Sequence, residues 1–216
     1  EISACLVGSE MCIRDRSSNP VIVLGSGASV SYGIPGMGVL ANELKNFFKS
    51  NPYYDTATND VVSDFIKLLD SGVGLEAALL DVKVPEIVEA DIVNIVWKVI
   101  IESDAKVYER FISGEDINLR QLFDYIIYGD PNKTLNVIST NYDRIAEYAA
   151  CQTDAYINIG FTHGLMGKLK DNIMLNPKKP EADYTGFINI LKVHGSLDWY
   201  RSCLLYTSPS PRDRQK

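Results

Sequence analysis

The chain has 216 residues, of which 46% are hydrophobic and 23% charged, and its formal net charge is -7 at pH 7. This balance suits one globular domain with a sizeable core and excludes a disordered chain or a fibre. The negative charge disfavours broad binding to nucleic acid or to an anionic membrane, because both need a basic protein face. No apolar run reaches the roughly 18 residues that span a bilayer. We therefore expect a soluble, cytoplasmic protein that acts on a small molecule.

The two ends of the chain, residues 1–16 and 202–216, fit no element of the pattern between them. Each resembles translated sequencing-adaptor read-through, and both carry Arg-Asp-Arg, so we expect them to be non-native tails. The expected domain is then 17–201, and we expect the natural protein to continue past Arg201. Of the four cysteines, Cys151 alone lies inside this domain. This predicts a reducing compartment and no disulfide framework.

The predicted elements alternate between strands and helices. A short apolar run at 21–24 ends at Gly25, which is typical of a buried parallel strand, and residues 39–49 carry apolar side chains at helical spacing. Between about 55 and 130 the periodicity predicts three helices and few strands, which indicates a helical insertion.

Strand patterns return at 134–140, 155–159 and 186–193, and residues 141–150 predict a helix. Residues 164–185, rich in Lys, Asn, Pro and Gly, predict a surface excursion with a hairpin. The alternation predicts an α/β fold with a Rossmann-like, mostly parallel sheet and helices on both faces. The helical insertion lies between the first strand and the strand before Asn141.

A glycine-rich turn, Gly25-Ser26-Gly27-Ala28-Ser29, follows the first strand. Ligands of open α/β sheets bind beyond the carboxyl ends of the strands. The two glycines permit a tight turn and the close approach of a pyrophosphate, and Ala28 and Ser29 begin a short helix whose amides are able to bind phosphate oxygens. A bare Gly-x-Gly is a weak signal, and a merely tight turn is the alternative. No Gly-Lys-Ser/Thr follows, which disfavours a triphosphate-binding P-loop.

Two further polar clusters follow later strands. Residues 139–143 read Ser-Thr-Asn-Tyr-Asp, in which Asn141 or Asp143 alternatively serves only to cap the next helix. Residues 193–199 read Val-His-Gly-Ser-Leu-Asp-Trp. His194 closes a buried strand there, where a general base is well placed near neutral pH. A lone histidine is nevertheless more often structural than catalytic.

Together the clusters resemble the sirtuin family in order, spacing and position at strand ends. The family pattern is Gly-Ala-Gly-x-Ser, Gly-Ile-Pro, Thr-Gln-Asn-x-Asp and His-Gly; this chain has Gly-Ser-Gly-Ala-Ser, Gly-Ile-Pro, Ser-Thr-Asn-Tyr-Asp and His-Gly-Ser between residues 20 and 200. The resemblance implies NAD as the ligand and three catalytic residues, Asn141, His194 and Asp143. It further implies that NAD contacts Gly25, Ser26, Gly27, Ala28, Ser29, Gly33, Ile34, Pro35, Thr140, Gly195 and Ser196.

Two departures separate the chain from sirtuin deacylases. Gly36-Met37-Gly38 stands where those enzymes have Asp-Phe-Arg, and no paired Cys-x-x-Cys follows the His-Gly before Arg201, so no metal is expected within this fragment. The helical insertion and the His-Gly-Ser-Leu-Asp-Trp ending resemble instead the sirtuin-like NAD hydrolase domains of prokaryotic antiphage defence proteins, which usually carry a fused sensor domain.

The leading hypothesis is an NAD glycohydrolase of this defence type, which takes NAD as substrate and cleaves its nicotinamide–ribose bond. In this hypothesis Asn141 orients water or ribose, His194 accepts the proton, and Asp143 stabilises the ring cation or grips the carboxamide. An NAD-dependent protein deacylase and a non-catalytic nucleotide-sensing module stay open. The expected partner is NAD, and neither nucleic acid nor a membrane is expected as a partner. A homo-oligomer and a fused sensor domain stay open for the intact protein.

Overall fold

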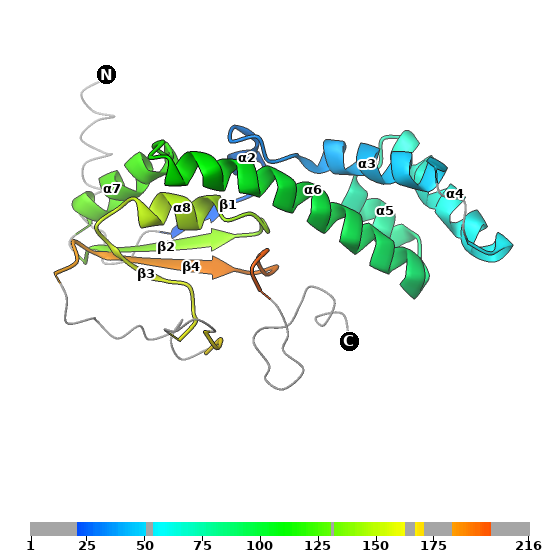
Figure 1. Ribbon diagram of the computed structural model, residues 1–216. Coiled ribbons are helices and arrows are strands. Elements are labelled where there is room, and N and C mark those ends of the chain that lie inside the picture. The colour runs from blue at the N-terminus through cyan, green and yellow to red at the C-terminus, as the bar shows by residue number, and fades with distance from the viewer. Residues whose placement is uncertain (1–20, 51–53, 131, 163–166, 171–182, 200–216) are drawn as a thin grey trace, which may run out of the picture.

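The computed structural model describes residues 21–50, 54–130, 132–162, 167–170 and 183–199. It is built on one four-stranded, all-parallel sheet with the strand order β1-β2-β4-β3 (Figure 1). The strands are β1 (Val21–Leu24), β2 (Thr134–Ser139), β3 (Tyr156–Asn158) and β4 (Phe187–Lys192). The predicted Rossmann-like α/β fold is confirmed. The two expected tails lie outside the described residues.

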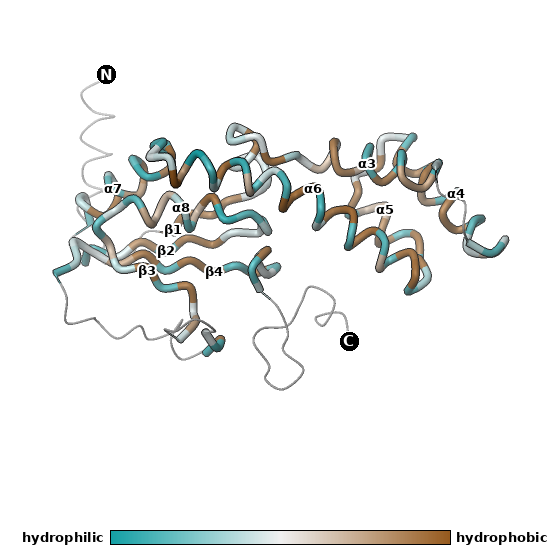
Figure 2. Tube along the Cα trace, viewed as in Figure 1, coloured by the Kyte–Doolittle hydropathy of each residue, from teal (hydrophilic) through white to brown (hydrophobic). Residues whose placement is uncertain are grey.

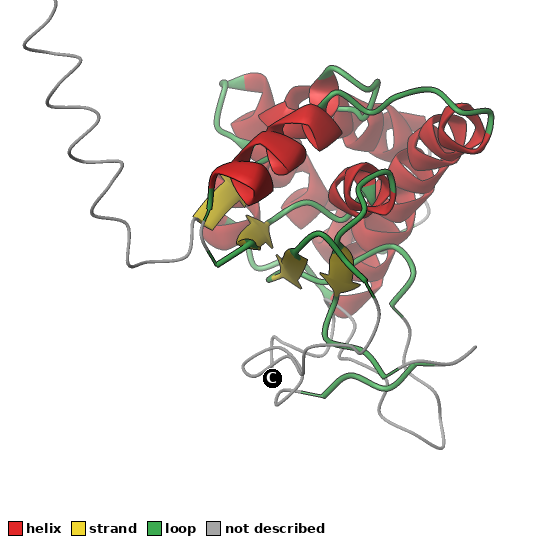
Figure 3. Cartoon of the chain, turned by 90° about the vertical axis from the view of Figure 1, so that its left-hand side faces the viewer, coloured by secondary structure: helices red, strands yellow, loops and turns green. Residues whose placement is uncertain are grey.

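The central strands β2 and β4 bury one face of the sheet by alternation. Leu135 and Val137 of β2, and Ile188 and Ile190 of β4, are almost completely buried. Helices α7 (Leu119–Gly129) and α8 (Ile145–Cys151) contact these strands and lie on the same side of the sheet (Figure 1 and Figure 3). We expected helices on both faces, and within the described residues the helices that contact the sheet cover one face.

The opposite face carries a row of hydrogen-bonded asparagines. Asn136, Asn189 and Asn158 lie opposite one another on β2, β4 and β3. Asn189 Nδ2 donates to Asn136 Oδ1 at 2.9 Å, and Asn158 Nδ2 donates to Asn189 Oδ1 at 3.0 Å. A shift of any strand by one residue breaks this row, so the row helps to set the register of the three strands.

Helices occupy most of the long segment between β1 and β2. The short α2 (Gly27–Val30) follows β1, and α3 (Met37–Ser50), α4 (Thr56–Asp70) and α5 (Leu75–Asp81) lie beyond the carboxyl end of the sheet (Figure 1). The predicted helices at 39–49 and within 55–130 are confirmed as α3, α4, α6 and α7. The helix expected at 141–150 begins only at Ile145, because the residues before it bind the glycine-rich turn instead.

The longest helix, α6 (Glu86–Ile112), connects the outlying helices with the sheet. It contacts α3 and α8, and the Tyr54 hydroxyl donates a hydrogen bond to Asp91 near its start. Figure 2 shows apolar and polar residues alternating along α6, whereas β2 and β4 are mostly apolar. Of the helices in the described residues, none combines the length and apolar character needed to cross a membrane.

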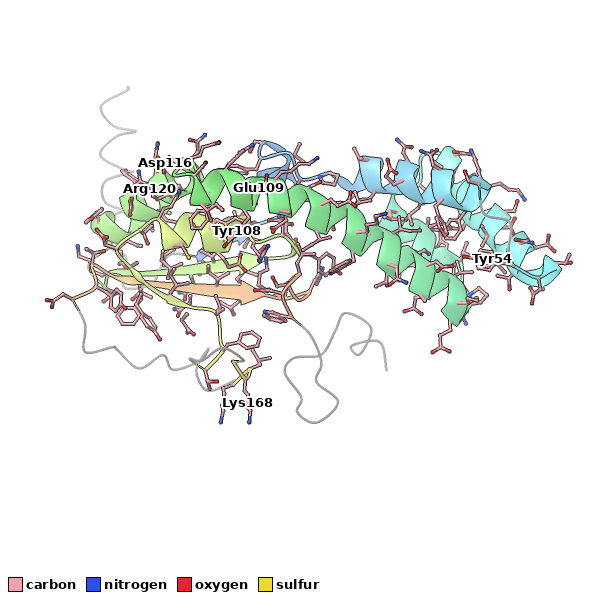
Figure 4. The ribbon with its side chains drawn as sticks, in the orientation of Figure 1. Tyr54, Tyr108, Glu109, Asp116, Arg120 and Lys168 are labelled. Atoms are coloured by element: carbon pink, nitrogen blue, oxygen red, sulfur yellow. The ribbon has the colours of Figure 1, made fainter. Side chains whose placement is uncertain are left out.

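A short antiparallel contact follows β3. Phe161 pairs with Leu169, Thr162 N donates to Lys168 O at 3.0 Å, and Lys170 N donates to Gly160 O at 2.9 Å. Lys168 projects from this contact, away from the sheet (Figure 4). This contact lies where the predicted surface excursion at 164–185 begins; residues 163–166 and 171–182, which include His163, lie outside the described residues.

Candidate functional site

The three polar clusters predicted from the sequence lie at the carboxyl edge of the sheet. They follow β1, β2 and β4, which are neighbours in the strand order. The register pairs Leu24 with Ser139 and Ser139 with Lys192. Backbone hydrogen bonds continue past the strand ends, from Thr140 N to Leu24 O and from Val193 N to Ser139 O, both at 3.1 Å. The residues that follow these strands therefore meet at one edge.

Asn141 is held by the glycine-rich turn. Its Nδ2 donates to Gly25 O and to Ser29 Oγ, each at 2.9 Å. The Gly25 carbonyl only accepts hydrogen bonds, so the nitrogen and not the oxygen of the carboxamide must face it. Both hydrogens of Nδ2 are thereby used. The described residues supply no donor to Asn141 Oδ1, which is the atom left to accept a hydrogen bond from a ligand.

Asp143 is buried just before α8. It is 4% exposed, and its carboxylate accepts from Ile145 N at 3.2 Å. Burial raises the pKa of Asp143, while Lys192 and hydrogen bonds from Ser29 and Ile145 oppose the rise. The alternative role as N-cap is not found, because Arg144 is the N-cap of α8 and makes no side-chain cap bond, although Asp143 does accept from the first amide of the helix.

His194 lies on the surface just after β4. Its ring centroid is 6.5 Å from that of Tyr142, and among the described residues it has no hydrogen-bond partner. Gly195 adopts a φ of 93°, which favours glycine, and Leu197 N donates to Tyr142 O at 3.0 Å. The loop after β4 is thus fastened to the loop after β2. The imidazole itself is open to solvent, as a base that exchanges protons with water must be.

Neither the backbone conformation nor the packing of the chain requires glycine at positions 25 and 27. Neither Gly25 nor Gly27 has a positive φ, and a Cβ at either would meet no atom within 4 Å. We expected the amides of Ala28 and Ser29 to bind phosphate. They donate instead to Gly25 O and Ser26 O, at 3.0 and 3.1 Å, because α2 is a single turn that closes on the residues before it. The open space over the glycines remains for a ligand.

The Gly-Ile-Pro segment supports the turn from behind. Gly33 adopts a φ of 93°, and Ile34 N donates to Ser29 O at 3.3 Å. The Ile34 side chain is 5% exposed and belongs to the hydrophobic core. We expected this residue to contact NAD, and its side chain packs inward instead. Pro35 is half-buried next to it, and Ser196 Oγ, on the loop after β4, donates to Tyr142 O at 3.5 Å.

A buried ionic network beneath the site was not predicted from the sequence. Asp104 of α6 is fully buried and accepts from Arg144 N at 2.8 Å, Arg144 Nε at 3.0 Å and Tyr148 Oη at 2.8 Å. The Arg144 guanidinium also lies over the rings of Tyr108 and Tyr148 (Figure 4 labels Tyr108). The signal was available, since Asp104 falls at helical spacing from the buried Val107.

A second buried charge lies at the end of β4. Lys192 is 5% exposed, donates to the Asp143 carbonyl and pairs with Glu147 Oε1 at 3.4 Å. Among the described residues, Glu147 Oε2 has no hydrogen-bond partner, and burial raises the pKa of Glu147 while Lys192 opposes the rise. Strand alternation signalled this lysine too, because it shares a face with the buried Ile188 and Ile190.

A scan against protein-family models matches no family, and a search of the curated proteins finds no match. The resemblance to sirtuins therefore rests on the residues of the four matched motifs and stays a prediction. In the part of the chain that the structure describes, no three His, Cys, Asp or Glu side chains are grouped as ligands of a metal ion.

The site combines three chemical capacities. No atom lies within 4 Å of where a Cβ of Gly25 or Gly27 would be, so a ligand group is able to approach the backbone of the turn. Asn141 Oδ1 offers an acceptor of known direction, which suits an O–H donor. The exposed His194 imidazole is a candidate general base.

Proposed function

We propose that the chain binds NAD at this edge of the sheet and hydrolyses the bond between nicotinamide and ribose. The observation that carries the proposal is the Asn141 carboxamide, which Gly25 and Ser29 orient with its oxygen left as an acceptor. A ribose hydroxyl or a water molecule is the O–H donor that such an oxygen takes. NAD also has the pyrophosphate that a glycine-rich turn at a strand end accommodates.

In this reaction the carbon–nitrogen glycosidic bond breaks and nicotinamide leaves with the bonding electron pair. The oxygen of water forms the new bond to the ribose carbon, and the water proton passes to His194. The products are nicotinamide and ADP-ribose, and no oxidant or reductant is needed. Asn141 contributes by orienting the water or the ribose, which lowers the entropic part of the barrier. Asp143, which is buried and accepts from Ile145 N, supports the loop before α8 rather than contacting NAD.

The full chain incubated with NAD, with and without an acylated lysine peptide, separates the candidate functions by the release of nicotinamide. Release without peptide supports the hydrolase. Release that requires the peptide supports the deacylase, and NAD binding without release supports the nucleotide-sensing module. Either of these last two outcomes overturns the proposal.

Two substitutions test the assignment of the site. Asn141→Ala and His194→Ala are each expected to slow NAD cleavage by about 100-fold, the typical contribution of an orienting or proton-transfer group. Asn46→Ala, at an exposed position of α3, is the matched control and is expected to keep the wild-type rate. Wild-type rates in both site variants would show that the reaction takes place elsewhere.

We also propose, from the resemblance, an effector role in prokaryotic antiphage defence. Active chain expressed in bacteria is then expected to lower cellular NAD, and Asn141→Ala is expected to leave it unchanged. Equal NAD levels in cells with either protein would argue against this role.

A further inference from the structure

Ser29 differs from the rest of the glycine-rich turn because it is buried. It is 2% exposed, and its Oγ accepts a hydrogen bond from Asn141 Nδ2 at 2.9 Å. A side-chain hydrogen bond from Ser29 is among the influences that hold down the pKa of Asp143 against the effect of burial. Because its Oγ is engaged by Asn141 and only 2% of the residue is exposed, Ser29 does not present its hydroxyl to a phosphate oxygen.

These contacts fix the direction of the Asn141 carboxamide. A serine oxygen has lone pairs that accept hydrogen bonds, and Ser29 Oγ takes one hydrogen of Asn141 Nδ2. The Gly25 carbonyl, which only accepts, takes the other hydrogen of the carboxamide at 2.9 Å. Both acceptors thereby turn Nδ2 toward the chain and Oδ1 away from it.

We propose that Ser29 is a positioning residue, which aligns the Asn141 carboxamide for catalysis, and that it does not bind the phosphates of NAD. This inference rests on the proposed function and changes the role that the sirtuin resemblance implies for this serine. It also identifies the group that Asn141 takes as an O–H donor, a ribose hydroxyl or water. An acceptor such as a carbonyl oxygen finds no free hydrogen there.

Ser29→Ala removes the hydroxyl while the rest of the turn stays intact. The carboxamide of Asn141 then loses one of its two anchors, and kcat for NAD cleavage is expected to fall by about 100-fold, as for a small misplacement of a reacting group. ADP serves as a probe of the phosphate contacts, since it lacks the nicotinamide ribose. Its Kd, measured by calorimetry, is expected to stay at the wild-type value.

Ser31→Ala, at an exposed position two residues on, is the matched control and is expected to change neither kcat nor the Kd for ADP. An ADP affinity that weakens in Ser29→Ala as much as kcat falls would make Ser29 a phosphate ligand. An unchanged kcat would leave it without a role. Either result overturns the inference. If the alanine variant is unfolded, Ser29→Cys, which is similar in size and a weak donor, is expected to show the same separation of kcat from ADP affinity.

A readout without turnover keeps this inference separate from the proposed function. The side-chain NH₂ protons of Asn141, followed by NMR, are expected to exchange slowly with water in the wild type and faster in Ser29→Ala, because one anchor is gone. Equal exchange would overturn the positioning role even if the wild type cleaves NAD. A wild type that leaves NAD intact, but shows the difference in exchange, would refute only the proposed function.

Discussion

Asp104 is a single carboxylate on which the residues before α8 depend. It is fully buried and accepts four hydrogen bonds, three from Arg144 and one from the Tyr148 hydroxyl. Asp104→Ala leaves the Arg144 cation, itself 26% exposed, without its partner. We expect the free energy of unfolding to fall by about 3 kcal/mol, the lower end for a broken buried pair. Urea denaturation measures the loss.

Asp116 provides the matched control for this prediction. It pairs with Arg120 at 2.7 Å on the surface near the start of α7 (Figure 4). Solvent screens exposed pairs of this kind, so Asp116→Ala is expected to change stability too little to resolve. Similar losses in the two variants would contradict the structural importance given to Asp104.

Glu147 makes the stability of the chain depend on pH. Burial raises its pKa from the ordinary 4.5, and Lys192 opposes the rise. The folded chain therefore holds this proton to higher pH than the unfolded chain does. The stability that the proton contributes is present below pH 4.5 and is lost as the pH rises through the folded value.

Glu147→Gln has no such proton to lose. Relative to the wild type, this variant is expected to gain stability as the pH rises from 4.5 toward neutrality. Urea unfolding at a series of pH values measures the difference. Curves that stay parallel over that range would contradict the direction of the pKa shift.

Individual residues of the site were predictable where a motif marks a strand end, and less so where packing decides. Asn141 and His194 lie where strand ends were expected. The roles of Ser29 and Ile34 were not predictable from the sequence. Ser29 depends on the side chain of Asn141, more than a hundred positions away, and Ile34 depends on packing in the core. Lys192 was visible as a charge in an apolar alternation, and that signal was overlooked.

At the scale of elements, β4 begins beside a glycine on which two other segments pack. A Cβ on Gly186 would lie 2.6 Å from Ile127 Cγ2 of α7 and 2.6 Å from the carbonyl oxygen of Lys133. That carbonyl also accepts from Phe187 N at 2.7 Å, so it does not move freely. Gly186→Ala is expected to lower the unfolding free energy by about 1–3 kcal/mol, as overpacking does. Thermal and urea unfolding test this.

Gly38 is the control for Gly186. It lies in the first turn of α3 without a positive φ, and a Cβ there would meet no atom within 4 Å. Gly38→Ala is therefore expected to leave stability unchanged or slightly higher. A Gly186→Ala variant as stable as Gly38→Ala would show that α7 and β4 are less closely packed than the structure indicates.

Long elements were predicted well because their periodicity repeats many times. α3, α4, α6 and α7 all span three or more turns with regularly spaced apolar residues. α5 has only seven residues and was missed. The start of α8 was predicted four residues too early, at Asn141, because local pattern does not register the tertiary hydrogen bonds that hold this residue.

For the whole molecule, one hydrophobic cluster joins the outlying helices to the sheet. It includes Phe65 of α4, Val107 of α6 and Ile188 of β4. The 27 residues of α6 span about 40 Å and provide the continuous link. We therefore expect the chain to unfold in one cooperative transition, without a state in which only the sheet or only the helices are folded.

The two tryptophans of the chain, Trp97 on α6 and Trp199 after β4, report on this separately. In Trp97→Phe, the remaining Trp199 reports on the edge of the sheet. In Trp199→Phe, the remaining Trp97 reports on α6. The two fluorescence midpoints in urea are expected to coincide after correction for the small stability change of each substitution. Clearly separated midpoints would show that the helical segment is a unit of its own.

Because β1 pairs with β2, which lies much later in the chain, β1 cannot join the sheet until the ribosome has synthesised β2. Gly25 and Asn141 lie 116 positions apart, and β1 finds its neighbour only when β2 has been made. At about 5–20 residues per second, the ribosome takes roughly 6–23 seconds to cover that interval, whereas helices form within microseconds. The helices between the two strands are thus free to fold first. During that interval the glycine-rich turn of the nascent chain lacks the hydrogen bonds from Asn141 to Gly25 and Ser29.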